Sequence, residues 1–468
     1  MRFLERLPHG APLIGGGLLV NGLASYVFLT IAARDLGPEA YTPVGLLWAL
    51  SFLLGPGFFQ PLEQETARII ASRFGRGVVP VVSSAAAIGG LVALGLVMVA
   101  AVAGPWMIDG FFDGESWLLV GLLLVVVGLG AAHLAKGVLA GLGRFGGYAR
   151  YVVGEGLGRL LAVGLLVAVV SDGIGAYALA IGLAPFIGIG VAMAGQRGLR
   201  TPGPPAPMGD LSRALGALLV ASVATAMVLN VSPLAVEALA GPGEGREPGR
   251  FLNALLVARI PLFFFQAVQA ALLPQLSGLA GAGRYGELWS VLRRLLTVVA
   301  TLGVAVLVVA AVAGPWAVEF AFGSEYAVTQ RDMVLLAVSS VGLMVVLSLA
   351  QGLIACRSRG RMALAWVAGL AVFPVVVALG SDLFLRVEVA LIATVAVAAA
   401  VMAVLLVERI RHEAATSAYL EAGRADSVAE AIVCGAPRTA PGALLHCGRV
   451  ERGRSRTSGV AVKETERT

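Results

Sequence analysis

Apolar runs of roughly 20 residues recur along the whole chain of 468 residues, and runs of that length can cross a bilayer as helices. The composition agrees, because 58% of the residues are hydrophobic and only 13% are charged, against about 25% charged in soluble globular proteins. Many further runs follow the first, which identifies it as a first span and not as a removable signal peptide. We therefore predict an all-α integral membrane protein.

The apolar runs predict twelve spans. Their expected bounds are 12–33, 41–60, 80–104, 117–135, 151–170, 174–194, 214–236, 251–273, 295–314, 333–355, 362–380 and 387–407. Cytoplasmic loops of membrane proteins carry the excess of Lys and Arg, so the charges of the loops between these spans predict the orientation of the chain.

The basic residues of the loops alternate between the two sides. Seventeen lie on one side, namely Arg2, Arg6, Arg68, Arg73, Arg76, Lys136, Arg144, Arg150, Arg197, Arg200, Arg213, Arg284, Arg293, Arg294, Arg357, Arg359 and Arg361. Five lie on the other, namely Arg34, Arg246, Arg250, Arg331 and Arg386. We expect a multi-pass protein of the cytoplasmic membrane with both termini in the cytoplasm.

Residues 408–468 differ from the rest of the chain. They contain no apolar run and mix basic and acidic residues with Ser, Thr, Gly and Pro, which is typical of a disordered segment. We predict a disordered cytoplasmic tail at 408–468, and the alternative is a docking tail for a partner.

The six residues AVAGPW occur twice, at 101–106 and again 210 residues later at 311–316. At the same offset Tyr41 faces Phe251, and Asn21 faces Asn230 nearly in register. An internal repeat explains this better than chance composition. Six spans per repeat is an even number, so the two lobes, 1–200 and 201–407, are predicted to be parallel. Transporters built in this way bind substrate between the lobes near the midplane.

Charged residues inside the spans are the first candidates for function, because each costs about 2.5–3.5 kcal/mol at the centre of a spanning helix. Arg259 lies near the middle of the eighth predicted span, and its own helix offers no acid one turn away. Arg159 lies in the fifth span with Glu155 four residues earlier, a spacing that permits an ion pair on one helix face. A structural salt bridge and a functional role both stay open for Arg159.

Five uncharged polar residues are further candidates, namely Asn21, Asn230, Gln266, Gln269 and Gln351. Such residues hold helices together more often than they contact a ligand. The GPG sequence at 55–57 interrupts the second span, and Pro261 interrupts the eighth at nearly the equivalent place. Interruptions at matching positions of two repeats point to a binding site. The three cysteines and four histidines show no metal-site spacing, and we expect neither a metal nor another cofactor.

Two stretches, AARDLGPEAY (32–41) and PLFFFQAVQAALLPQLS (261–277), resemble polysaccharide and oligosaccharide exporters of the superfamily that also contains multidrug extruders and lipid-linked precursor flippases. The resemblance implies a MATE-like flippase fold with twelve helices in two parallel six-helix lobes. It also implies a polyprenyl-linked sugar as substrate, with its diphosphate held by basic residues of the central cavity. Arg259 is best placed for this role, Arg159 is second, and Arg34 lies at the outer mouth.

The leading hypothesis is therefore a flippase for lipid-linked oligosaccharide or polysaccharide units, which needs no catalytic residue and is not an enzyme. Membrane lipids and polysaccharide-synthesis enzymes are the expected partners, nucleic acid is not, and a monomer is expected. The alternative is a cation-coupled multidrug antiporter, in which Glu155 would bind the coupling cation. A membrane glycosyltransferase, a transporter of the major-facilitator type and a non-transporting scaffold are less favoured.

Overall fold

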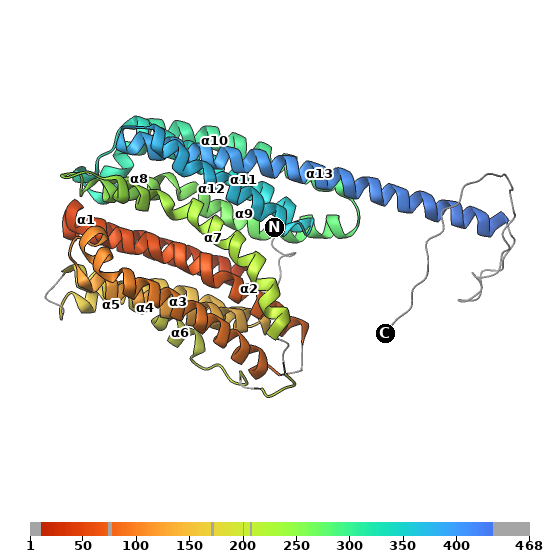
Figure 1. The fold of residues 1–468 in the computed structure, drawn as a ribbon, viewed down its shortest axis with the longest axis horizontal. Helices are drawn as coiled ribbons and strands as arrows, with labels where there is room; N and C mark the ends of the chain where they lie inside the picture. The colour runs from red at the N-terminus through yellow and green to blue at the C-terminus, as the bar shows by residue number, and fades with distance from the viewer. Residues whose placement is uncertain (1–10, 74–76, 170–172, 200, 206–207, 434–468) are drawn as a thin grey trace, which may run out of the picture. The chain divides into compact units, whose positions relative to one another are not determined.

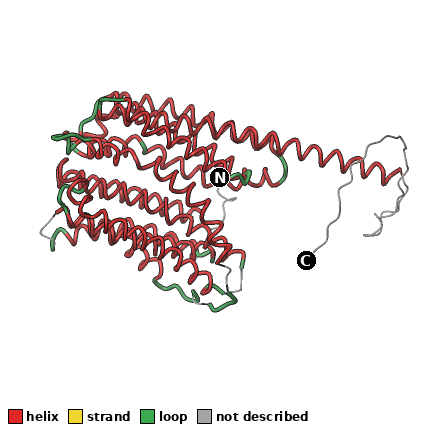
Figure 2. Tube along the Cα trace, in the orientation of Figure 1, coloured by secondary structure: helices red, strands yellow, loops and turns green. Residues whose placement is uncertain are grey.

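The computed structural model describes residues 11–433 except 74–76, 170–172, 200 and 206–207. Within this part the chain forms helices and no strands (Figures 1 and 2). The helices are α1 (Ala11–Leu54), α2 (Gln60–Ser72), α3 (Val79–Phe111), α4 (Ser116–Gly141), α5 (Phe145–Leu166), α6 (Gly173–Met193), α7 (Met208–Leu239), α8 (Glu247–Ala258), α9 (Ile260–Gly281), α10 (Tyr285–Phe322), α11 (Gln330–Ala355), α12 (Arg359–Leu379) and α13 (Leu383–Val433), with short turns η2 (Gly55–Phe59) and η3 (Ser324–Tyr326).

Nine helices of the described part are long and apolar enough to cross a membrane, and the architecture is that of a multi-pass membrane protein. One of these nine, Leu13–Ser72, contains the first two predicted spans. The helices α5, α8 and α9 are not among the nine. Of these, α5 carries three charged residues and α8 is short. The twelve predicted segments map onto these helices, while the number twelve itself stays a prediction.

The first two predicted spans are joined within α1 at Gly37, whose φ of 72° lies in the left-handed region. Glycine adopts this conformation without a steric penalty from Cβ, and Pro38 follows directly. The kink therefore lies within residues 34–40, which the sequence places between the two spans.

Both predicted interruptions appear in the structure. The GPG sequence forms η2, a π-helical turn between α1 and α2, and Pro261 follows a break at Arg259 that separates α8 from α9. Proline cannot donate a backbone hydrogen bond, so the helix changes direction or pattern there. At η2 the freed carbonyl of Pro56 accepts a hydrogen bond from Ser222 of α7.

The repeated AVAGPW sequence occupies equivalent places in α3 and α10. A Cβ added to Gly104 would meet Leu119 of α4 at 3.0 Å, and one added to Gly314 would meet Met333 of α11 at 2.9 Å. The glycines thus allow each helix to pack closely on the next one. Trp106 and Trp316 are 66% and 64% exposed, as expected for side chains that face lipid.

The largest buried cluster contains residues of both halves, among them Phe28, Leu122, Phe251, Leu336 and Leu391. A second cluster lies within the second half, among helices α7, α9, α10, α11, α12 and α13. The two halves of the repeat therefore share one core, and α1 contributes heavily to it.

The predicted tail boundary needs a correction. The chain divides into two units, one up to Ala414 and one from Ala415 on, and α13 continues as a helix to Val433. The segment after 407 is rich in Ala, Glu and Arg, which favour helix, and Arg409 pairs with Glu413 at 2.6 Å. Disorder from residue 408 is therefore wrong as far as Val433, and residues 434–468 lie outside the described part.

Candidate functional site

Arg259 lies at the break between α8 and α9, with helical dihedral angles of −94° and −1°. Its N–H donates to the carbonyls of Leu255 and Leu256 at 3.0 and 3.2 Å, and its own carbonyl accepts from Leu262 at 3.0 Å. The backbone therefore stays hydrogen-bonded through the break, although Pro261 contributes no donor. This arrangement fixes the Cα of Arg259 at the point where the two helix segments meet.

The side chain of Arg259 is half-buried. In the part of the chain that the structure describes, no carboxylate lies within ion-pair distance of its guanidinium. Its charge acts on Tyr26 of α1, whose hydroxyl donates to the carbonyl of Leu256 at 2.8 Å. A guanidinium without a counter-ion in a predicted span can bind an anionic group of a ligand.

Arg159 has a different environment. It is buried, and its Nη2 lies 3.6 Å from Glu155 Oε1 on the same helix. Nη1 donates to Ser25 Oγ at 3.1 Å, and the guanidinium lies 4.6 Å from the ring centre of Trp48. The ion pair that the sequence spacing permits is therefore formed. A cation stacked on an aromatic ring gains further stabilisation.

Asn21 lies one turn before Ser25, and the Ser25 hydroxyl reaches its Oδ1 at 3.5 Å, the limit of a hydrogen bond. A Cβ on Gly156 would meet that same oxygen at 2.7 Å, so α1 and α5 approach closely here. Asn21, Glu155 and Arg159 thus belong to one polar contact between α1 and α5.

Asn230 is not part of this group. Its Nδ2 donates to the carbonyls of Phe52 at 3.2 Å and Ala226 at 2.9 Å, so it ties α7 to α1. The side chain of Gln266 lies outside the described residues. Of the predicted site residues, the structure brings Asn21, Glu155 and Arg159 together and places Arg259 and Asn230 elsewhere.

Two residues missed by sequence reasoning connect the arginines to α1. Ser25 contacts Arg159, and the next residue, Tyr26, contacts α8, which Arg259 follows directly. Successive residues point about 100° apart around a helix. Ser25 and Tyr26 of α1 can therefore contact α5 and α8, which lie on different sides of α1. A tyrosine in the middle of a predicted span is the signal that could have indicated this stretch.

A second polar network lies between α2, α4 and α5. Glu63 Oε2 lies 2.8 Å from His133 Nδ1 and 3.1 Å from Lys136 Nζ. Tyr148 donates to the other oxygen of Glu63 at 2.8 Å. Because the polar groups of His133, Lys136 and Tyr148 are all paired with the carboxylate of Glu63, this network stabilises the packing of the three helices.

The two halves also meet at the helix ends that are predicted to lie outside. We call this the outer contact: Arg34, Tyr41, Thr42, Gly249, Asn253 and Tyr326. Arg34 Nε donates to the carbonyl of Ala321 at 2.9 Å, and Tyr326 donates to the carbonyl of Ala33 at 2.9 Å. Burial, and to a smaller degree the charge of Glu325, raises the pKa of the Tyr326 hydroxyl, so the hydroxyl stays protonated as a donor.

An apolar groove of about 540 Å³ lies apart from these residues, on the first half of the repeat. Its walls come from the start of α1 and from α5 and α6, and Leu157 and Leu161 line it with 44% and 69% of their surfaces exposed. Such a lining suits contact with lipid chains and contributes no polar group to the site at Arg259.

No protein-family profile matches the chain. An uncharacterized protein of Mycobacterium bovis is 26% identical over 377 residues, which cover 76% of this chain and 82% of that protein. An uncharacterized protein of Mycobacterium tuberculosis is 24% identical over 387 residues, which cover 81% of this chain and 87% of that protein. The similarity extends over most of each sequence.

Solved structures with a similar fold are MATE transporters. An inward-facing multidrug resistance MATE transporter of the MOP superfamily superimposes with a TM-score of 0.70 at 15% identity, covering 85% of this chain and 96% of its own. The outward-facing conformation of such a transporter gives 0.62 at 14% identity, covering 86% and 95%. A eukaryotic MATE transporter gives 0.61 at 13% identity, covering 89% and 99%. The chain therefore has the all-helical fold of the MATE transporters.

Proposed function

We propose that this protein is a flippase that moves lipid-linked oligosaccharide or polysaccharide units from the inner to the outer leaflet of the cytoplasmic membrane. The fold supports transport as the general activity. The observation that carries the choice of substrate is Arg259, a half-buried guanidinium in a predicted span without a carboxylate partner among the described residues.

The chemistry of a guanidinium suits a diphosphate. Its planar fork can donate two parallel hydrogen bonds to phosphate oxygens, and it stays charged at any physiological pH. Tyr26 adds a hydroxyl close to the same charge. Arg159 is less suited to bind a ligand in this conformation, because its guanidinium already contacts Glu155, Ser25 and Trp48. Transport changes no covalent bond, so none of these groups acts as a catalyst.

The outer contact supports an alternating-access cycle. It joins the two halves at one end of the helices through hydrogen bonds that run from the first repeat to the second. The superposition with the inward-facing transporter has a higher TM-score than the one with the outward-facing transporter. Both observations fit a protein that is closed outside, and the cycle then requires the outer contact to break.

The test is a flipping assay with the full-length protein in liposomes and a fluorescent polyprenyl-diphosphate sugar. Arg259→Ala is expected to lower the rate at least ten-fold, since a charge-assisted contact contributes about 1.5–3 kcal/mol. Arg259→Lys should keep part of the activity, because the charge remains and the fork is lost.

Arg284→Ala is the matched control, since Arg284 is exposed and paired with Glu287 three residues later. Wild-type rates in Arg259→Ala would refute the proposed role.

The alternative is a cation-coupled multidrug antiporter. Two observations favour it: the similar structures include multidrug resistance transporters, and Glu155 is a half-buried acid in a predicted span. This alternative predicts efflux of organic cations and its loss in Glu155→Gln. Binding of a polyprenyl diphosphate without binding of organic cations favours the flippase, and the reverse result favours the antiporter.

A further inference from the structure

Glu388 lies in the second turn of α13 and is 0% exposed. Neither oxygen of its carboxyl group has a hydrogen-bond donor among the residues that the structure describes. Phe384, one turn earlier on the same helix, packs on Phe251 of α8 with ring centres 5.3 Å apart. A carboxyl group in such an apolar site is unusual, because buried polar groups are normally hydrogen-bonded.

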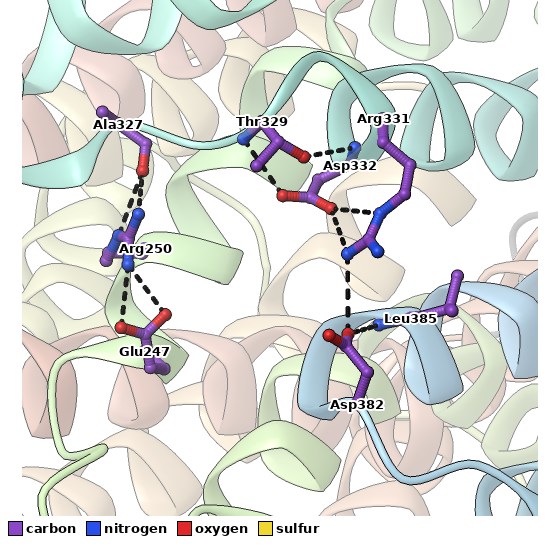
Figure 3. A network of polar contacts seen from close by, with 8 residues as sticks. All are labelled: Glu247, Arg250, Ala327, Thr329, Arg331, Asp332, Asp382 and Leu385. Carbon is purple, nitrogen blue, oxygen red and sulfur yellow. Dashed lines mark hydrogen bonds and ion pairs between the residues drawn. The ribbon is translucent and has the colours of Figure 1, made fainter.

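The charged groups that act on Glu388 are already engaged with one another, as Figure 3 shows for Arg331, Asp332 and Asp382. From α11, Arg331 donates to Asp332 at 2.9 Å and lies 3.5 Å from Asp382. Asp382, in the turn before α13, also accepts from the N–H of Leu385 at 2.8 Å. The charges of Asp332, Arg331 and Asp382 all act on Glu388, but the guanidinium of Arg331 is already paired with the two aspartates.

Two further arginines of the second half are paired with other groups. Arg386, on the same helix as Glu388, donates to the carbonyl of Leu239 at 3.0 Å. Arg250 of α8 donates to Glu247 at 2.8 Å and to the carbonyl of Ala327 (Figure 3). An ionised Glu388 would therefore be a buried charge without a partner beside two other acids, which is strongly unfavourable.

A proton resolves this conflict better than a metal cation does. A metal cation needs several oxygen ligands, and both oxygens of Asp332 are already taken, Oδ2 by the N–H of Thr329 and Oδ1 by Arg331. A protonated carboxyl group needs no ligand set and carries no charge. The apolar packing around Phe384 and Phe251 then becomes compatible with Glu388.

We propose that Glu388 is a proton-binding site of the second half, which holds a proton in this conformation and releases it when the cluster of Arg331, Asp332 and Asp382 opens. Glu388 lies six residues after Asp382, about 9 Å along a helix, and Asp382 and Arg331 are about half exposed. The proton therefore has a short path from the carboxyl group to water at the predicted outer ends of α11 and α13. A role of this proton in driving transport rests on the proposed function, whereas the binding of the proton to Glu388 does not.

Infrared spectroscopy of the purified full-length protein tests the occupancy without any substrate. A protonated carboxyl group has its own C=O band, which shifts in heavy water and disappears as the pH rises and the proton leaves. We expect this band at neutral pH in the wild type and its loss in Glu388→Gln. Glu287→Gln is the control and should keep the band, because Glu287 is exposed and paired with Arg284. If the wild-type and Glu388→Gln spectra agree in the region of this C=O band at neutral pH, Glu388 does not hold a proton and the proposal is wrong.

A second experiment tests the coupling. Liposomes with an imposed pH gradient are used to measure flux of the fluorescent polyprenyl-diphosphate sugar. We expect the gradient to accelerate the wild type at least ten-fold and to leave Glu388→Gln, which mimics the protonated state, unaffected. Flux of Glu388→Gln that still responds to the gradient would overturn the coupling role. Failure of the proposed function has a different signature, namely no flux in the wild type with the infrared band present.

Discussion

The hydroxyl of Tyr41 donates a 2.7 Å hydrogen bond to Oδ1 of Asn253, and neither side chain is exposed. Tyr41 belongs to the first half of the repeat and Asn253 to the second. Gly249, one turn before Asn253, donates its N–H to the hydroxyl of Thr42 at 3.2 Å. Neighbouring residues of α1 are thus bonded to successive turns of α8, and this pair of helices is the centre of the outer contact.

Tyr41→Phe should weaken the outer contact. It removes one buried hydrogen bond and leaves Asn253 Oδ1 without its donor, which costs about 1–3 kcal/mol. We expect a lower midpoint in thermal unfolding of the purified protein. Tyr285→Phe is the control, since its hydroxyl reaches Glu413 only at 3.4 Å and should change the midpoint little. Equal midpoints for wild type and Tyr41→Phe would mean that this bond does not stabilise the outer contact.

Gly249→Ala should force α1 and α8 apart. The added Cβ would lie 2.7 Å from Thr42 Oγ1 and 3.2 Å from Tyr41 Cδ1, and overpacking of this kind costs about 1–3 kcal/mol. We expect a lower midpoint in thermal unfolding of the purified protein. Gly286→Ala is the matched control in a helix with open space around it, where alanine should be neutral or stabilising. A Gly249→Ala midpoint equal to that of the wild type would contradict the close contact.

Much of the fold could be predicted because membranes impose simple rules on sequences. The apolar runs indicated the helices, and Pro261 and the GPG sequence indicated where they break. The end of α13 was missed because the segment after 407 is polar, and a polar helix without an apolar face has no periodicity to recognise. Its helix propensity, from Ala, Glu and Arg, was the weaker but correct signal.

The candidate site was predictable only where its contacts are local. The pair of Glu155 and Arg159 follows from a spacing of four residues, and its formation is confirmed. The contacts of Arg159 with Ser25 and Trp48 join α1 to α5 across more than 100 residues of sequence. No periodic pattern encodes which faces of two distant helices meet, so the partners of Arg159, the role of Tyr26 and the isolation of Glu388 required the structure.

Arg159→Met separates a structural role from a ligand-binding one. Removal of one member of a buried ion pair costs about 3–5 kcal/mol, and we expect a loss near the lower limit because Glu155 keeps 17% of its side chain exposed. Combining it with Glu155→Gln removes the unpaired charge and should restore part of the thermal stability. A double variant that regains both stability and transport assigns Arg159 to structure, and one that regains only stability assigns it to the substrate.

A reducible crosslink between Glu39 and Arg246, beside the outer contact, should stop transport. Arg246 and Glu39 form an exposed ion pair of 2.9 Å between the two halves, and exposed pairs contribute at most about 1 kcal/mol, so cysteines are tolerated there. Glu39→Cys and Arg246→Cys are introduced with Cys356, Cys434 and Cys447 replaced by serine. If the halves separate at this end in each cycle, a short crosslink lowers flux at least ten-fold and a reductant restores it.

Cysteines at Arg284 and Glu287, an exposed pair on one helix turn, provide the control because their crosslink spans no moving contact. Unchanged flux with the outer crosslink in place would show that transport proceeds without opening at the contact of Tyr41 and Asn253.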